Sequence, residues 1–147
     1  MDLALLDTDI LSDLLKQRNP CVVTRAANYL GLHGQFALSV FSRFEFTRGY
    51  QEKGATTRLV RFQEFCRHTL VVPVSDAIFD RAENLWVLAR RGGYAHNDAD
   101  LIIAATAMEF GRILVTGCLA RFYGTGINAR RAVDMSRQAP SAAVTSV

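Results

Sequence analysis

The chain lacks several features that would assign it to large classes of protein. Its apolar stretches are short and interrupted by charges, so none of them has the length of a membrane-spanning helix. No basic region precedes the short apolar run at the N-terminus, which argues against a secretory signal peptide. The cysteines are few, odd in number and far apart, which predicts free thiols rather than a disulfide framework or a zinc site. They are Cys21, Cys66 and Cys118. We therefore expect a cytoplasmic protein.

Internal repeats, interdomain linkers and a phosphate-cradling glycine loop are also missing. The glycine-rich stretches are not followed by the Lys-Ser/Thr pair that such a loop requires. The chain has 147 residues, half of them hydrophobic, which suits one domain with a substantial core. We expect this single domain to span residues 1–137, and a small, polar C-terminal tail to follow over residues 138–147.

Short apolar runs alternate with segments of helical periodicity along the chain. This alternation predicts an α/β fold, a three-layer α/β/α sandwich around a central, mainly parallel sheet. Strands are expected at 3–7, 36–40, 70–74 and 113–116, with a further short strand near 126–128, and helices at 8–16, 20–30, 42–50, 56–67, 76–91 and 98–110.

The balance of charges is mildly basic. The net charge is +3 and the pI is about 9.0, which fits a nucleic-acid partner. Many enzymes of this size are equally basic, so charge alone does not decide the matter.

Asp7 is the most informative acidic residue of the chain. It closes the apolar run 3–6, and a carboxylate at the C-terminal edge of a central parallel strand is where α/β proteins place their chemistry. The alternative is a simple N-cap for the next helix, a role that Asp9 could equally take.

Three further acids stand in unusual places. Glu45 lies among phenylalanines, where an acid needs a metal or a partner such as Arg43 or Arg48. Asp98 and Asp100 open the most apolar helix, where they could equally just favour the helix N-terminus. Carboxylates of this kind are the ligands of Mg²⁺ or Mn²⁺ acting on phosphate. Clustered acids without a metal repel one another, which predicts a raised pKa for at least one of them.

Four blocks of the sequence resemble those of a PIN-domain ribonuclease, in particular the VapC-like toxins of type II toxin–antitoxin systems. They follow the family order over residues 3 to about 128. The blocks are 5–11, 39–49, 98–107 and 113–117.

The resemblance implies a PIN-type sandwich and a metal-dependent endoribonuclease that hydrolyses RNA phosphodiester bonds. It implies that Asp7, Glu45 and Asp100 hold Mg²⁺ or Mn²⁺, with Asp98 assisting. It also implies a homodimer and a VapB-like antitoxin as partners. Thr116, or Thr8, would orient a water or a phosphate oxygen.

One departure from the family pattern concerns the end of the last block. The family usually places Asn or Asp, and then a His or an acid before Phe, where this chain has Cys118 and Arg121. Cysteine is a poor ligand for Mg²⁺. A fourth acidic ligand is therefore missing. Either three acids suffice to hold the metal, or Asp98 replaces the missing ligand, or the activity is weakened. Arg121 could instead contact the RNA backbone. The rival interpretation is a degenerate, non-catalytic PIN-type module that binds RNA or protein. A phosphatase-like α/β enzyme fits the later blocks poorly.

Phenylalanines are numerous in the segment between the second and third expected strands. Either all of them belong to the core, or a few line a groove for an antitoxin helix. They are Phe41, Phe44, Phe46, Phe62 and Phe65.

Overall fold

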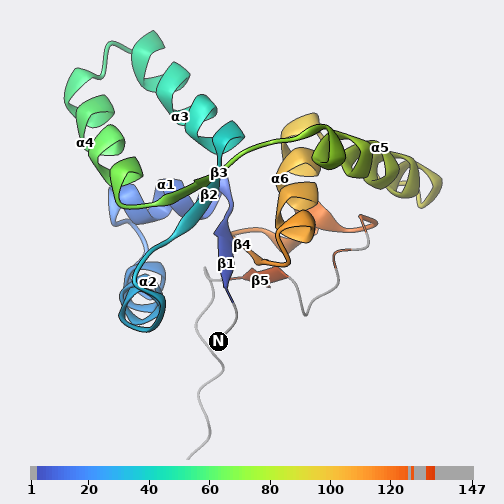
Figure 1. The fold of residues 1–147 in the computed structure, drawn as a ribbon, viewed down its shortest axis with the longest axis horizontal. Helices are drawn as coiled ribbons and strands as arrows, with labels where there is room; N and C mark the ends of the chain where they lie inside the picture. Colours follow the sequence, from blue (N-terminus) through green and yellow to red (C-terminus); the bar gives the residue numbers. More distant parts are fainter. Residues whose placement is uncertain (1–2, 126, 128–131, 135–147) are drawn as a thin grey trace, which may run out of the picture.

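The computed structural model of the chain describes residues 3–125, 127 and 132–134 (Figure 1). Its strands pair only in parallel within this part of the chain. One sheet has the order β1 (Ala4–Leu6), β4 (Ile113–Thr116), β5 (Ala132–Asp134), and a second pairs β2 (Ala37–Ser39) with β3 (Leu70–Val72). Strand β2 also contacts β1, so the two sheets lie next to each other.

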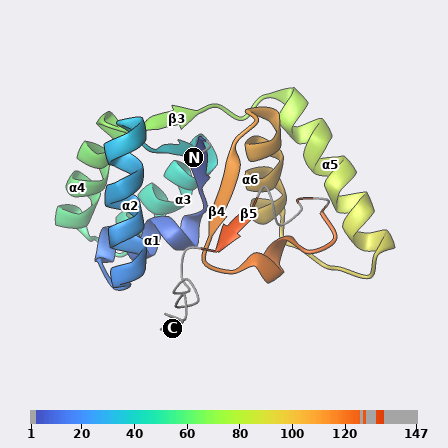
Figure 2. The ribbon, with the colours of Figure 1, turned by 90° about the horizontal axis from the view of Figure 1, so that it is seen from below.

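Helices cover the strands from two sides, as Figure 2 shows. The group formed by α1 to α4 lies on one side of the strands, and α5 and α6 lie on the other. The predicted α/β fold, with parallel strands between two layers of helices, is therefore confirmed; the parallel strands form a three-stranded and a two-stranded sheet. The helices are α1 (Thr8–Lys16), α2 (Pro20–His33), α3 (Val40–Glu52), α4 (Thr56–Arg67), α5 (Asp76–Arg91) and α6 (Asp98–Glu109), with a short 3₁₀ turn η1 (Leu119–Phe122).

Alternation along the strands places apolar side chains on both faces. Leu5 and Leu114 belong to the core beneath α5 and α6, whereas Leu6 and Val115 belong to the core beneath α1 and α2. In the pairing of β1 with β4, Leu5 lies opposite Leu114 and Leu6 lies opposite Val115. Each residue therefore faces a partner that belongs to the same core, which fixes the register.

Helix boundaries follow local capping rather than hydrophobic periodicity alone. Helix α3 begins at Val40, two residues before the expected start, because the Ser39 hydroxyl accepts a hydrogen bond from the Phe41 backbone N–H. Helix α2 continues past its expected end near residue 30, and Gly34 ends it in the left-handed conformation with φ 78°.

Helix α6 is the most deeply placed helix of the fold. Its residues from Asp100 to Ala107 are all buried, because the strands lie on one side of it and α5 packs along the other. Its first turn therefore carries acidic side chains to the edge of the strands.

Two predictions concern residues that the structure does not describe. The short strand expected near 126–128 includes Gly126 and Asn128, which lie outside the described residues. The tail expected at 138–147 lies outside them as well. The domain limit near residue 137 likewise stays a prediction. Within the described ranges, no helix is long and apolar enough to cross a bilayer.

Candidate active site at the carboxyl edge of the strands

The C-terminal ends of the parallel strands converge at one edge, and Asp7 lies at its centre. Asp7 follows β1, is completely buried, and is the N-cap of α1. Its Oδ1 accepts a hydrogen bond from the Thr8 backbone N–H at 2.7 Å. Its Oδ2 accepts one from the hydroxyl of Thr116, the last residue of β4, at 2.8 Å. The predicted N-cap and the predicted site residue are therefore one and the same, and both carboxylate oxygens are fixed in place.

The environment of Asp7 raises its pKa from the ordinary value of 3.8 to about 6. Burial is the largest cause, because it disfavours the charged form, and the negative charge of Asp9 adds to it. The Thr116 hydrogen bond and the charge of Arg121 act in the opposite direction. A raised pKa was expected from repulsion between clustered acids; its largest cause is instead desolvation, and the acid that repels Asp7 is Asp9.

Glu45 lies on α3 and is linked to Asp7 through the neighbouring Thr8. The Thr8 hydroxyl lies 3.2 Å from Glu45 Oε1 and 3.4 Å from the Ser42 hydroxyl, so it can donate to either one. Glu45 is half-buried. Of the two arginines considered as its partner, Arg48 lies instead over the Phe44 ring, 4.9 Å from the ring centre.

Asp100 occupies the third position of α6, and its side chain is almost fully buried. Its backbone N–H donates to the side chain of Asn97, the N-cap of the helix, at 2.8 Å. Its carboxylate receives a two-pronged pair from Arg121: Nε donates to Oδ2 at 3.2 Å, and Nη2 donates to Oδ1.

Arg121 is the residue that the sequence did not reveal as part of this centre. Its Nη1 also pairs with Asp9 and lies 3.6 Å from Asp7 Oδ2, so one guanidinium contacts three carboxylates. Burial disfavours the cation, but hydrogen bonds to Asp100 and the charges of Asp7 and Asp100 outweigh that effect and raise the pKa of Arg121. Its place directly before Phe122, where the family has a His or an acid, was the only sequence indication of a role here.

The residues present fit a divalent metal in donor type but not in arrangement. Carboxylate oxygens are the ligands that Mg²⁺ and Mn²⁺ prefer. Yet the described part of the chain holds no group of three or more His, Cys, Asp or Glu side chains placed to hold a metal ion. The Arg121 guanidinium lies against Asp7 and Asp100 instead. The assignment of Asp7, Glu45 and Asp100 as metal ligands stays a prediction.

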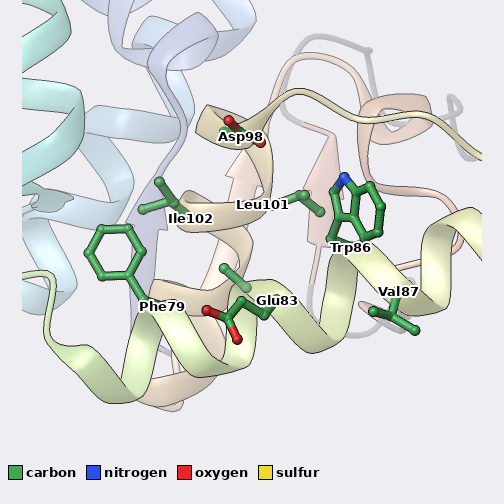
Figure 3. Close-up of a pocket in the computed structure, with 8 residues that line it drawn as sticks. Phe79, Glu83, Trp86, Val87, Asp98, Leu101 and Ile102 are labelled. Atoms are coloured by element: carbon green, nitrogen blue, oxygen red, sulfur yellow. The ribbon is translucent and has the colours of Figure 1, made fainter.

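Asp98 is exposed and lines a groove between α5 and α6 (Figure 3). The groove has a volume of about 340 Å³ and is largely apolar, with Phe79 and Trp86 along α5 and Ile102 on α6. Asp98 is thus only two residues from Asp100, but it lines a different surface. Its role as an assisting ligand stays a prediction.

The five phenylalanines divide between core and surface. Phe62 is buried, Phe44 is 52% exposed, and the other three are partly buried. Phe46 and Phe65 pack against Phe62, with ring centres 5.1 and 6.3 Å away. Most of the set is therefore core, and Phe44 is the member that faces solvent.

Comparison with known families places this geometry in context. The family model described as "PIN domain" matches residues 4–117. The chain belongs to the PIN domain family. The matched range includes every predicted site residue and ends just before the segment that carries Arg121. Among curated proteins, none matches the sequence.

Solved structures share this PIN fold at low sequence identity. VapBC-1 from nontypeable Haemophilus influenzae gives a TM-score of 0.76 at 18% identity, covering 92% of this chain and 99% of that chain. DNA-bound VapBC from Salmonella typhimurium gives 0.75 at 19%, covering 92% and 99%. FitAcB from Neisseria gonorrhoeae gives 0.73 at 21%, covering 84% and 93%. At such identities the likeness establishes the fold.

Proposed function

We propose that this PIN domain is a metal-dependent endoribonuclease toxin of a toxin–antitoxin pair, acting in the cytoplasm on RNA phosphodiester bonds. The observation that carries the proposal is a pair of buried carboxylates at the carboxyl edge of a PIN fold. Asp7 and Asp100 lie close enough together for one cationic group, the Arg121 guanidinium, to contact both. Buried carboxylates are costly unless a cation or hydrogen bonds compensate them, so their presence here supports a functional site.

The residues around these acids fix their orientation. Thr116 and the Thr8 backbone hold the two oxygens of Asp7, and the Thr8 hydroxyl reaches Glu45. With a pKa of about 6, Asp7 is mainly ionised at neutral pH. We propose Mg²⁺ or Mn²⁺ as the cofactor and Asp7, Glu45 and Asp100 as its ligands, because such ions neutralise charge on a phosphate and activate water.

Asp98 is proposed to assist from the exposed start of α6. If it does, Asp98→Asn lowers the cleavage rate and raises the metal concentration that half-maximal cleavage requires. An unchanged rate and metal dependence would make Asp98 only a groove-lining acid of the helix start.

A basic cleft near the far end of α1 supports RNA as the substrate. It has a volume of about 350 Å³ and is lined by four cationic side chains around Tyr50. Helix α1 has nine residues and is therefore about 14 Å long, so the cleft lies a few nucleotides from Asp7 at the other end of the helix. The cationic residues are Lys16, Arg18, Arg58 and Arg61.

The experiment that tests the activity is cleavage of single-stranded RNA over a titration of Mg²⁺ and Mn²⁺. We expect metal-dependent cleavage by the unaltered chain and none by Asp7→Asn. If the folded chain, free of any partner, cleaves nothing at any metal concentration, the non-catalytic binding module is the better interpretation. A double variant, Arg58→Ala/Arg61→Ala, should raise KM, whereas the exposed pair Arg90→Ala/Arg91→Ala serves as the charge-matched control.

The partners are proposed to be a VapB-like antitoxin and a second copy of the chain. The solved neighbours from Salmonella typhimurium and Haemophilus influenzae are VapBC pairs, and this likeness supports an antitoxin partner for this chain. We propose that the antitoxin covers Phe44, and that the dimer covers the groove at Trp86, because exposed apolar side chains of this size favour contact with protein. Phe44→Asp should abolish antitoxin capture but leave the dimer intact in light scattering. Trp86→Asp should leave antitoxin capture intact but give a monomer in light scattering.

A further inference from the structure

The guanidinium of Arg121 has an unusual set of partners for a side chain at the surface. It comes from η1, is 29% exposed, and contacts carboxylates from α6, from α1 and from the end of β1. The pair with Asp100 uses both prongs of the guanidinium, a geometry that favours a defined position over a loose surface contact.

Two of these carboxylates have little access to water. The side chains of Asp7 and Asp100 are 0% and 5% exposed, so solvent cannot compensate their charges. A buried ionised carboxylate is stable only beside a counter-cation or several hydrogen bonds. Arginine keeps its charge at any physiological pH. The chain therefore supplies a permanent cation of its own to the acids that the proposed nuclease would use for a metal.

We propose that Arg121 is a tethered counter-cation of the acid centre, and that a divalent ion enters this centre only when the guanidinium leaves it. The guanidinium and the ion need the same oxygens of Asp7 and Asp100, and two cations a few ångströms apart repel each other. The inference rests on the proposed function in assigning that ion to the reaction, but the competition itself is a property of these contacts.

The third partner shows where the side chain can go. Asp9 is 49% exposed and lies two residues after Asp7, in the first turn of α1. Arg121 can break its two hydrogen bonds to the buried Asp100 and keep its ion pair with the more exposed Asp9. This movement needs a change of side-chain conformation and leaves the strands in place. Asp9 therefore keeps the displaced Arg121 guanidinium close to the acid centre, so that it can pair with Asp100 again when the ion leaves.

Binding of Mn²⁺ alone, measured by calorimetry, tests the competition. Arg121→Ala should bind Mn²⁺ at least about tenfold more tightly than the unaltered chain, because a positive charge beside the site has been removed. Arg81→Ala is the matched control, since Arg81 pairs with Glu109 at the opposite end of α6. The double variant Arg121→Ala/Asp100→Asn should lose the gain. Equal affinity in Arg121→Ala, Arg81→Ala and the unaltered chain would overturn the inference.

A second measurement uses the unaltered chain and does not depend on the folding of any variant. The Nε–H of Arg121 donates to Asp100, so its NMR resonance reports the closed arrangement. Saturation with diamagnetic Mg²⁺ should shift this resonance and speed its exchange with water. If Mg²⁺ binds at Asp7 while the Arg121 resonance stays unchanged, the guanidinium does not have to leave and the inference is refuted.

The two proposals fail in different ways. If Arg121→Ala gains Mn²⁺ affinity but no form of the chain cleaves RNA, the counter-cation stands and the nuclease does not. If the unaltered chain cleaves RNA with Mn²⁺ and removal of Arg121 leaves the affinity unchanged, the nuclease stands and the counter-cation does not.

Discussion

Replacing Asp7 by asparagine is expected to make the protein more stable at neutral pH, although Asp7 is the central residue of the proposed site. Its pKa is raised from 3.8 to about 6, so folding favours the neutral form. A carboxyl group with a raised pKa costs no stability below its unfolded pKa. The cost grows as the pH rises from about 4 to about 6 and is constant above that range.

The size of the effect follows from the shift. About 2 pKa units at about 1.4 kcal/mol each give ~3 kcal/mol as the upper limit at pH 7.5. Asparagine keeps one acceptor for Thr116 or the Thr8 N–H but presents an N–H₂ group to the other, which costs about 1 kcal/mol. A net gain of about 1–2 kcal/mol remains, which corresponds to a rise in Tm of roughly 2–8 °C for a chain of this length.

Urea unfolding between pH 4 and pH 8, in the presence of EDTA, measures this difference. The advantage of Asp7→Asn over the unaltered chain should be absent near pH 4, appear between pH 4 and 6, and level off above. Asp80→Asn on the exposed face of α5 is the control. A difference that does not change with pH would refute the assignment of the cost to a buried charge at Asp7.

Three further changes test neighbouring parts of the structure. Thr116→Val removes the hydroxyl that donates to Asp7, so the acidic limb of the cleavage pH profile should move up by about one pH unit. Cys118→Asp adds a carboxylate where the backbone N–H already contacts Thr116, and should tighten Mn²⁺ binding in calorimetry roughly tenfold, unlike Cys118→Ala. Gly124→Ala should cost about 1–3 kcal/mol in urea unfolding, because Gly124 has φ 76° and a Cβ would overlap the Tyr94 ring. Adding Tyr94→Ala should recover part of that loss.

Strands β1 to β4 and most helices were predictable because their signals are local, whereas β5 (Ala132–Asp134) was not predicted. Apolar runs placed β1 and β4, and the limits of α1 and α4 agree with the sequence prediction. The position of Asp7 at a strand end also follows from its neighbours. The extra turn of α2 was not predicted, because a helix tolerates Gly31 at an exposed position at modest cost.

The content of the acid centre was only partly predictable. Asp7 and Asp100 were identified from strand and helix ends, but Arg121 meets Asp9 from 112 positions away along the chain. No local pattern reports such a contact, because it depends on how the turn after β4 folds back over the strand edge. The hydroxyl of Thr116 was expected to face water or phosphate, and its buried bond to Asp7 depends on the same long-range pairing.

The pairing of β1 with β4 also sets an order of events during synthesis. Asp7 and Thr116 are 109 residues apart, and a ribosome adding about 5–20 residues per second needs roughly 5–20 s to make the segment between them. During that time β1 is made but lacks its hydrogen-bonded neighbour. Contacts this distant in sequence also slow folding itself. Asp7 is thus translated long before its partners, and the nascent chain has no assembled centre until β4 and the turn carrying Arg121 emerge and fold.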